Sequence, residues 1–389
     1  MRIGDESARD LEASLVRQLR TASGVSRVGL ARRMELAPST VGQYVDRLIE
    51  GGYLREGRKA TPSAGRPPTA LELDPAAGHF IGVDFEAKQL WVTAVDFAQQ
   101  PLGYRKLPIR AADTASAVIS KIESAVTAAS KGHGPLLGIG VGVPGAVDMQ
   151  RGIGLHYRFI RGWRDVPLAR RLADRFGVPV HLENNIRAMA FAEELFGQGR
   201  GLTDFVCFGI RSGIAAGVVM DGQLHAGPRN LAGEIGGWPC EEGRTLEQLA
   251  SLSAIVNSLE EAVGAGKATS LKLRRSRLRL EDVLRGAREG DRLVLEVLWR
   301  AGQVVGIVAA QLNLLLNPER IIVAGPLAAF EDEFIRAIRE TLEPLAPAPH
   351  AMMPVVSGSE LGEFAGALGG AALAARRWTP ARTKRHSER

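Results

Sequence analysis

The strongest constraint on the fold is a strand pattern that occurs twice along the chain. From Phe80, the apolar segments IGVDF and LWVTAVDF precede a third segment that ends near Pro108, a helical stretch over 114–130 and the apolar run LLGIGVGV. Strand-like segments return after Thr203 as FVCFGI and AAGVVMDG, with helical patterns behind them. This repeated β-β-β-α-β order predicts an α/β fold with two lobes, in which ligands bind near strand ends and glycine-rich turns.

The N-terminal segment has a different pattern, which predicts three short helices followed by a basic, hairpin-like stretch. An apolar stripe over 9–22 indicates the first helix, Ser26 is a suitable N-cap for the second, and Pro38 suits the first turn of a third that stops at Gly51. Two short helices joined by a tight turn and followed by a basic, hairpin-like stretch are typical of a winged helix-turn-helix. We therefore predict an all-α DNA-binding domain over 1–60; a helical protein-interaction or dimerisation domain is the alternative.

In such domains the second helix of the pair enters the major groove and presents its N-terminal residues to base edges. Val41, Val45 and Leu48 are then expected to face the core. The residues expected to contact double-stranded DNA are Ser39, Thr40, Gln43 and Arg47. The linker predicted over 61–75 contains Arg66 in a Gly-Arg-Pro sequence that resembles an AT-hook, which places an arginine in a narrow minor groove. A plain interdomain linker explains the same composition.

The distribution of charge also favours a nucleic-acid partner. Residues 1–70 carry 12 Lys and Arg against 8 Asp and Glu, and residues 376–389 carry 6 against 1, so the net charge of +6 comes from the two ends. The basic tail over 379–389 is predicted to be disordered. Two cysteines, a charged start and the expectation of no membrane span indicate a cytoplasmic protein.

Six motifs in a fixed order point to one family. They lie at 140–145, 182–190, 212–222, 232–237, 318–325 and 361–367, and read GVGVPG, LENNIRAMA, SGIAAGVVMDG, AGEIGG, PERIIVAG and LGEFAGA. Together they resemble the ROK family of repressors, open reading frames and kinases, and the N-terminal segment is similar to that of its repressor branch. The resemblance implies a two-lobed, actin-like sugar-kinase domain, predicted here over 76–378.

The departures from the kinase pattern indicate that catalysis is lost. Family kinases bind phosphate with an Asp-x-Gly-Gly-Thr loop, whereas residues 84–87 read DFEA, and the adenosine-side glycine pair is reduced at Gly325. Asn185 replaces the expected catalytic aspartate, and an amide cannot accept the sugar proton. Gly237 replaces a zinc-binding histidine, and Cys240 is the one cysteine left of three. We expect no enzyme activity, no cofactor and no metal.

By the same resemblance, a carbohydrate effector remains as ligand. Asn184, Glu234 and Glu247 match positions that hydrogen-bond sugar hydroxyls, and Trp238 could stack on a pyranose face. The alternative is that both glutamates are structural residues satisfied by backbone amides.

The sequence thus predicts a sugar-responsive repressor, a homodimer or homotetramer that binds an inverted-repeat operator. A sugar kinase with an accessory DNA-binding domain is the main rival. A constitutive DNA-binding protein whose large domain only dimerises is the third possibility.

Overall fold

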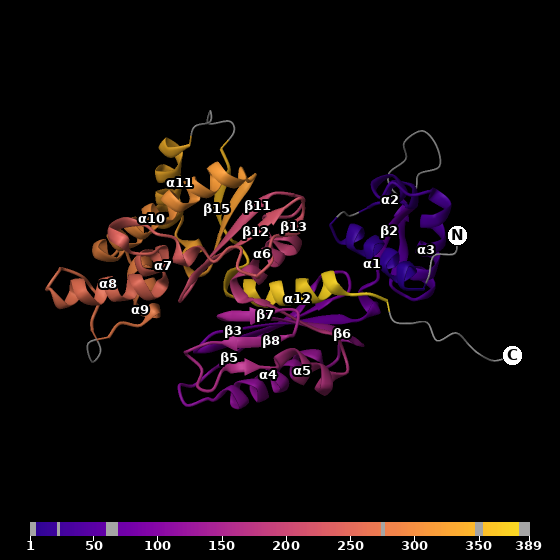
Figure 1. The fold of residues 1–389 in the computed structure, drawn as a ribbon, viewed down its shortest axis with the longest axis horizontal. Coiled ribbons are helices and arrows are strands. Elements are labelled where there is room, and N and C mark those ends of the chain that lie inside the picture. The colour runs from indigo at the N-terminus through magenta and orange to yellow at the C-terminus, as the bar shows by residue number, and fades with distance from the viewer. Residues whose placement is uncertain (1–4, 22–23, 60–68, 274–276, 347–352, 381–389) are drawn as a thin grey trace. The chain divides into compact units, whose positions relative to one another are not determined.

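The computed structural model describes residues 5–21, 24–59, 69–273, 277–346 and 353–380 (Figure 1). The chain forms two compact units, each assembled from separated stretches of sequence. The first comprises Met1–Val141, Gln150–Leu182 and Gly370–Arg389, and the second comprises Gly142–Met149 and Glu183–Gly369. Helix α12, Ala365–Arg377, begins in the second unit and ends in the first.

The first unit opens with the predicted helix-turn-helix. Its elements are α1 (Asp5–Thr21), α2 (Arg27–Arg33), α3 (Pro38–Glu50), β1 (Leu54–Lys59) and β2 (Thr69–Leu73). The hydroxyl of Ser26 caps α2 by accepting a hydrogen bond from the Gly29 amide at 3.2 Å, and Pro38 begins α3, as predicted. The domain is not all helical, because β1 and β2 pair antiparallel as a wing. Strand β2 lies inside the segment 61–75 that composition alone assigned to a linker.

A five-stranded sheet forms the centre of the first unit. Its order is β10-β6-β3-β4-β5, made of Val180–Asn184, Leu136–Val143, His79–Phe85, Gln89–Asp96 and Pro101–Pro108. Helix α4, Ala115–Ser130, packs on β3, β4 and β5, and α5, Leu168–Phe176, lies beside α4 on the same face (Figure 1). Strands β8 (Ile153–His156) and β9 (Arg164–Val166) form an antiparallel pair. The strand-strand-strand-helix-strand order is the one predicted.

A second five-stranded sheet, of order β13-β12-β11-β14-β15, forms the centre of the second unit. These strands are Gln223–Leu224, Ile214–Met220, Phe205–Ile210, Arg320–Ala324 and Val355–Gly358. Side chains of β11 alternate between two cores: Val206 and Phe208 face one cluster, whereas Phe205 and Cys207 face the other. Helix α6 (Asn185–Phe196) packs on β11 and β12 and contributes to the second cluster.

The first of these clusters also contains most helices of the second unit. They are α7 (Leu246–Ala250), α8 (Leu252–Gly264), α9 (Leu280–Arg288), α10 (Arg292–Leu316) and α11 (Arg336–Leu342). Helix α10 is long and apolar enough to cross a membrane, yet most of it is buried inside the unit. A core helix of a globular protein meets the same criteria, so this helix is weak evidence for a membrane.

Short segments complete the two units. They are strand β7 (Ala146–Asp148), the 3-10 helices η1 (Pro75–Ala77), η2 (Ile235–Gly237), η3 (Glu241–Gly243), η4 (Pro326–Ala329), η6 (Glu343–Leu345) and η8 (Gly362–Phe364), and the π-helix η5 (Glu331–Ile335).

Candidate nucleic-acid interface and carbohydrate site

Helix α3 has one buried face and one exposed face, as expected of a recognition helix. Val41, Val45 and Leu48 are buried together with Tyr44. On the opposite face Ser39, Gln43 and Arg47 are exposed and Thr40 is half-buried. No side chain caps the start of α3, so its first amides carry no side-chain partner there. An open helix N-terminus with small polar residues suits a phosphate or a base edge.

Arg47 is less free than the sequence indicated. Its guanidinium lies 5.1 Å from the Tyr44 ring centroid and 3.9 Å from a Glu12 carboxylate oxygen on α1. To contact a base, Arg47 would therefore have to give up its contacts with the Tyr44 ring and the Glu12 carboxylate. Arg32 and Arg33, at the end of α2, are exposed and were not singled out from the sequence. Their position in the last turn before α3 is the signal that could have identified them.

Arg66, the predicted minor-groove residue, lies outside the residues that the structure describes. The same holds for 381–389 of the predicted tail. Its first two residues are described, and the Pro380 carbonyl accepts a hydrogen bond from Nε of Arg9 at 3.1 Å. Within the described part of the predicted tail, Pro380 therefore has a hydrogen-bond contact with α1.

Asn184, a predicted sugar contact, is the N-cap of α6. Its Oδ1 accepts hydrogen bonds from the Ile186 and Arg187 amides at 3.0 and 3.2 Å, and its Nδ2 donates to the Gly145 carbonyl at 3.2 Å. Both lone pairs of Oδ1 are therefore used by the fold, and one N–H of the amide remains for a ligand. Asn185, in the place of the expected catalytic aspartate, is the first residue of α6 and is buried.

A buried ion pair beside Asn184 was not predicted. Arg187 donates from Nε and Nη2 to Oε1 of Glu183 at 2.9 and 2.7 Å, and both side chains are at most 4% exposed. Nη1 of the same arginine donates to the carbonyl of Asn230 at 2.5 Å and to that of Ala232 at 3.4 Å. Arg187 therefore ties α6 to the loop that carries Glu234. Because Glu183 lies on β10 and Arg187 on α6, their four-residue spacing is not that of a helical ion pair, and no local sequence pattern identifies the contact.

Glu234 and Glu247 are brought together by the fold. Gly233 holds φ of +86°, and a Cβ there would lie 1.9 Å from the Ala216 carbonyl oxygen, so only glycine lets this loop lie against β12. Burial raises the pKa of the Glu234 carboxyl; Arg187 opposes the rise and Glu247 adds to it. Glu234 is nevertheless exposed as a residue, so a ligand can reach it.

Glu247 stands at the start of α7, where Thr245 and Gln248 form a capping box. Its Oε2 accepts a hydrogen bond from the Ile214 amide at 3.3 Å. The carboxylate thus lies at the turn between β11 and β12, and its residue is exposed. Glu247 lies close enough to add to the raised pKa of Glu234, and two exposed carboxylates at this distance can accept hydrogen bonds from neighbouring hydroxyls of a polyol.

Trp238, Gly237 and Cys240 lie on the neighbouring segment. Trp238 is half-buried against the larger core cluster, and its carbonyl accepts a hydrogen bond from the Leu246 amide at 2.9 Å. This packing gives Trp238 a structural role, and stacking on a sugar stays a prediction. A Cβ at Gly237 would meet nothing within 4 Å. Among the described residues, no group of three or more His, Cys, Asp or Glu side chains could hold a metal ion.

The turn at the end of β3, residues 84–87, uses its amides within the first unit. The Glu86 amide donates to the Gln89 carbonyl at 2.9 Å, and the Ala87 amide donates to the Tyr157 hydroxyl at 3.2 Å. Phe85 is buried and its ring lies 4.9 Å from that of Trp163. Amides that already have partners cannot cradle a phosphate without losing them.

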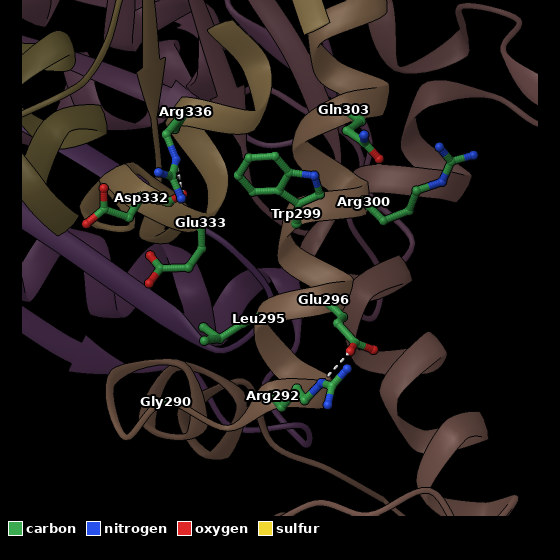
Figure 2. Close-up of a pocket in the computed structure, with 10 residues that line it drawn as sticks. All are labelled: Gly290, Arg292, Leu295, Glu296, Trp299, Arg300, Gln303, Asp332, Glu333 and Arg336. Atoms are coloured by element: carbon green, nitrogen blue, oxygen red, sulfur yellow. Dashed lines mark hydrogen bonds and ion pairs between the residues drawn. The ribbon is translucent and has the colours of Figure 1, made fainter. Parts of the chain in front are cut away.

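A surface cavity of about 580 Å³ lies elsewhere in the second unit, between α10 and the η5–α11 segment (Figure 2). Its basic side chains have partners: Nε of Arg292 lies 3.0 Å from the Glu296 carboxylate, and the Arg336 guanidinium covers the Trp299 ring at 5.4 Å. None of the four predicted sugar residues lines this cavity. It is therefore separate from the candidate carbohydrate site.

Comparison with known proteins gives consistent matches. A model of the ROK family matches residues 80–377. The DNA-binding transcriptional repressor Mlc of Escherichia coli (strain K12) is 27% identical over 363 residues, covering 90% of this chain and 88% of the repressor. A glucokinase of Halalkalibacterium halodurans is 29% identical over 313 residues, covering 75% of this chain and 93% of the enzyme. The crystal structure of a ROK family transcriptional regulator, a homologue of the E. coli MLC protein, has a TM-score of 0.79, 24% identity and 96% coverage of both chains.

Proposed function

The chain belongs to the ROK family, and from this premise we propose that it is a transcriptional repressor whose DNA binding is controlled by a carbohydrate. The observation that carries the proposal is the helix-turn-helix with an exposed polar face on α3, attached to a ROK domain. The match to Mlc extends over more of this chain than the match to the glucokinase does. The glucokinase match leaves about a quarter of the chain uncovered, whereas the Mlc match leaves about a tenth uncovered.

Direct readout of DNA is assigned to the first half of α3. Ser39, Thr40 and Gln43 can reach base edges, while Arg32 and Arg33 reach the phosphate backbone. Two copies of the chain on an inverted repeat would place two such helices in successive major grooves. We propose the homodimer as the smallest DNA-binding species.

Phosphoryl transfer is not part of the proposal. The reaction depends on donors that hold the transferred phosphate and on a base that orients the hydroxyl. Here the Ala87 amide is engaged by Tyr157, and Asn185 stands where the base is expected. The kinase-like domain then serves as a sensor, spanning 76–378 in our assignment.

The effector is proposed to be a neutral mono- or oligosaccharide bound by Glu234, Glu247 and the free N–H of Asn184. The proximity of Glu247, which adds to the raised pKa of the Glu234 carboxyl, supports a shared ligand. Such a ligand changes DNA affinity only through its different affinities for the DNA-binding and released states, an effect of typically ~1–3 kcal/mol.

The decisive experiment is fluorescence anisotropy of genomic DNA fragments with the full-length protein. We expect a bound fragment whose affinity falls steeply as the salt concentration rises. Gln43→Ala should weaken the free energy of binding by ~1–3 kcal/mol. Glu50→Ala, at the far end of the same helix, is the matched control and should leave binding unchanged. Binding that is equally strong in both variants would overturn the assignment of α3. ATP-dependent sugar phosphorylation by the unmodified chain would favour the kinase rival.

A further inference from the structure

Arg20 is a buried cation that has no hydrogen-bond acceptor among the described residues. It stands in the last turn of α1 and is 5% exposed, and within the part of the chain that the structure describes none of its three guanidinium nitrogens has a hydrogen-bond partner. Buried arginines are usually paired, because removing a charge from water costs several kcal/mol when nothing replaces the water. An unpaired guanidinium at this position therefore requires an explanation.

Aromatic rings surround this guanidinium instead of carboxylates. Its carbon lies 5.1 Å from the Phe80 ring centroid and 4.9 Å from that of Phe97. Tyr53 and Trp378 extend the cluster: their ring centroids lie 5.5 and 4.8 Å from that of Phe97 and 4.8 Å from each other. We call Arg20 and these four residues the aromatic joint.

The joint connects the winged helix to the first sheet. Arg20 comes from α1 and Tyr53 precedes the wing, whereas Phe80 lies on β3, Phe97 follows β4 and Trp378 follows α12. All five belong to the first unit. Any change in the orientation of the winged helix against β3 and β4 must therefore separate or rearrange this cluster.

The cation makes the joint weaker than an apolar cluster of the same shape. The cation–π contact with the two phenylalanine rings offsets only part of the cost of dehydrating the guanidinium. Burial, with Arg17 adding to it, lowers the pKa of Arg20 to about 9. Opening the joint returns the guanidinium to water and removes that penalty.

We propose that Arg20 is a positioning residue that keeps the winged helix reversibly docked on the first sheet, so that it can reorient when it binds an operator. The role in operator binding rests on the proposed DNA-binding function, whereas the weak docking follows from the burial of Arg20 alone. If Arg20 stabilised the docked state, an apolar side chain of similar shape at this position would loosen the joint. If Arg20 weakens the docked state, the same apolar side chain will tighten the joint.

The test compares Arg20→Met with Arg20→Lys by hydrogen exchange of the α1 amides in the full chain without DNA. Methionine keeps an unbranched chain and a favourable sulfur–ring contact without the charge, so exchange should slow about tenfold. Lysine is more strongly hydrated and cannot stack, so exchange should accelerate. Arg17→Met, one turn earlier and half-buried, removes the same charge and should change exchange less than threefold.

The same variants are then tested for operator binding. Arg20→Met should weaken binding about tenfold relative to Arg17→Met, because the docked orientation is stabilised. Faster exchange in Arg20→Met would overturn the proposal, and so would slower exchange with unchanged operator affinity. If the wild-type chain bound no DNA at all, the proposed function would fail while the exchange experiment would still decide whether Arg20 weakens docking.

Discussion

Replacing Glu183 by glutamine should loosen the loop that carries the candidate sugar site. The substitution keeps the shape of the side chain but leaves the Arg187 guanidinium, 2% exposed, without its counter-charge. Removing one partner of a buried ion pair costs about 3–5 kcal/mol. The amide oxygen of glutamine still accepts one hydrogen bond, so we expect about 3 kcal/mol, which corresponds to a roughly hundredfold increase in local opening.

Hydrogen exchange of the α6 amides measures this opening without assuming that the whole chain unfolds in one step. The pair of Arg292 and Glu296 provides the matched control: it has the same four-residue spacing and a 3.0 Å contact, but its side chains are 91% and 57% exposed. Glu296→Gln should cost less than about 0.5 kcal/mol. Equal effects of Glu183→Gln and Glu296→Gln would refute the reasoning that burial makes the Glu183–Arg187 pair contribute more to local stability.

Three further predictions concern stability. Burial raises the pKa of Glu193, so the native state holds more protons than the unfolded state between the ordinary value of 4.5 and the raised one. The free energy of unfolding therefore falls as pH rises through that window, and Glu193→Gln should flatten this dependence in thermal unfolding. Gly233→Ala should cost roughly 3 kcal/mol or more, because its Cβ would lie 1.9 Å from a backbone oxygen, whereas Gly237→Ala should stay within about 0.5 kcal/mol. Ser26→Ala should lower the midpoint of winged-helix unfolding, at a cost of about 1 kcal/mol.

Much of the fold was predictable because its signals are local. Ser26 and Pro38 mark helix starts by their own chemistry, and the run FVCFGI is apolar throughout because β11 is buried on both faces. The second strand of the wing was missed because 61–75 contains proline and glycine, which resemble a linker by composition. The basic, hairpin-like pattern after the third helix indicated a wing, but it did not show that the chain returns as a strand at 69–73 to pair with β1.

The candidate site was only partly predictable for the same reason. Motif positions identified Glu234 and Glu247, which the fold brings close together. The capping role of Asn184 and the bonds of Arg187 to the Asn230 and Ala232 carbonyls depend on backbone groups whose location the sequence does not reveal. The unpaired burial of Arg20 is likewise a property of the folded joint and not of α1 alone.

The central claim is that a carbohydrate at Glu234 and Glu247 controls DNA binding through α3. The most direct measurement is anisotropy of a bound operator fragment titrated with a panel of monosaccharides, for the wild type, Glu234→Ala and Glu247→Ala. We predict that one sugar changes the operator affinity of the wild type about fivefold or more, while both variants bind the operator normally and ignore the sugar. A sugar that shifts all three proteins equally would contradict the account.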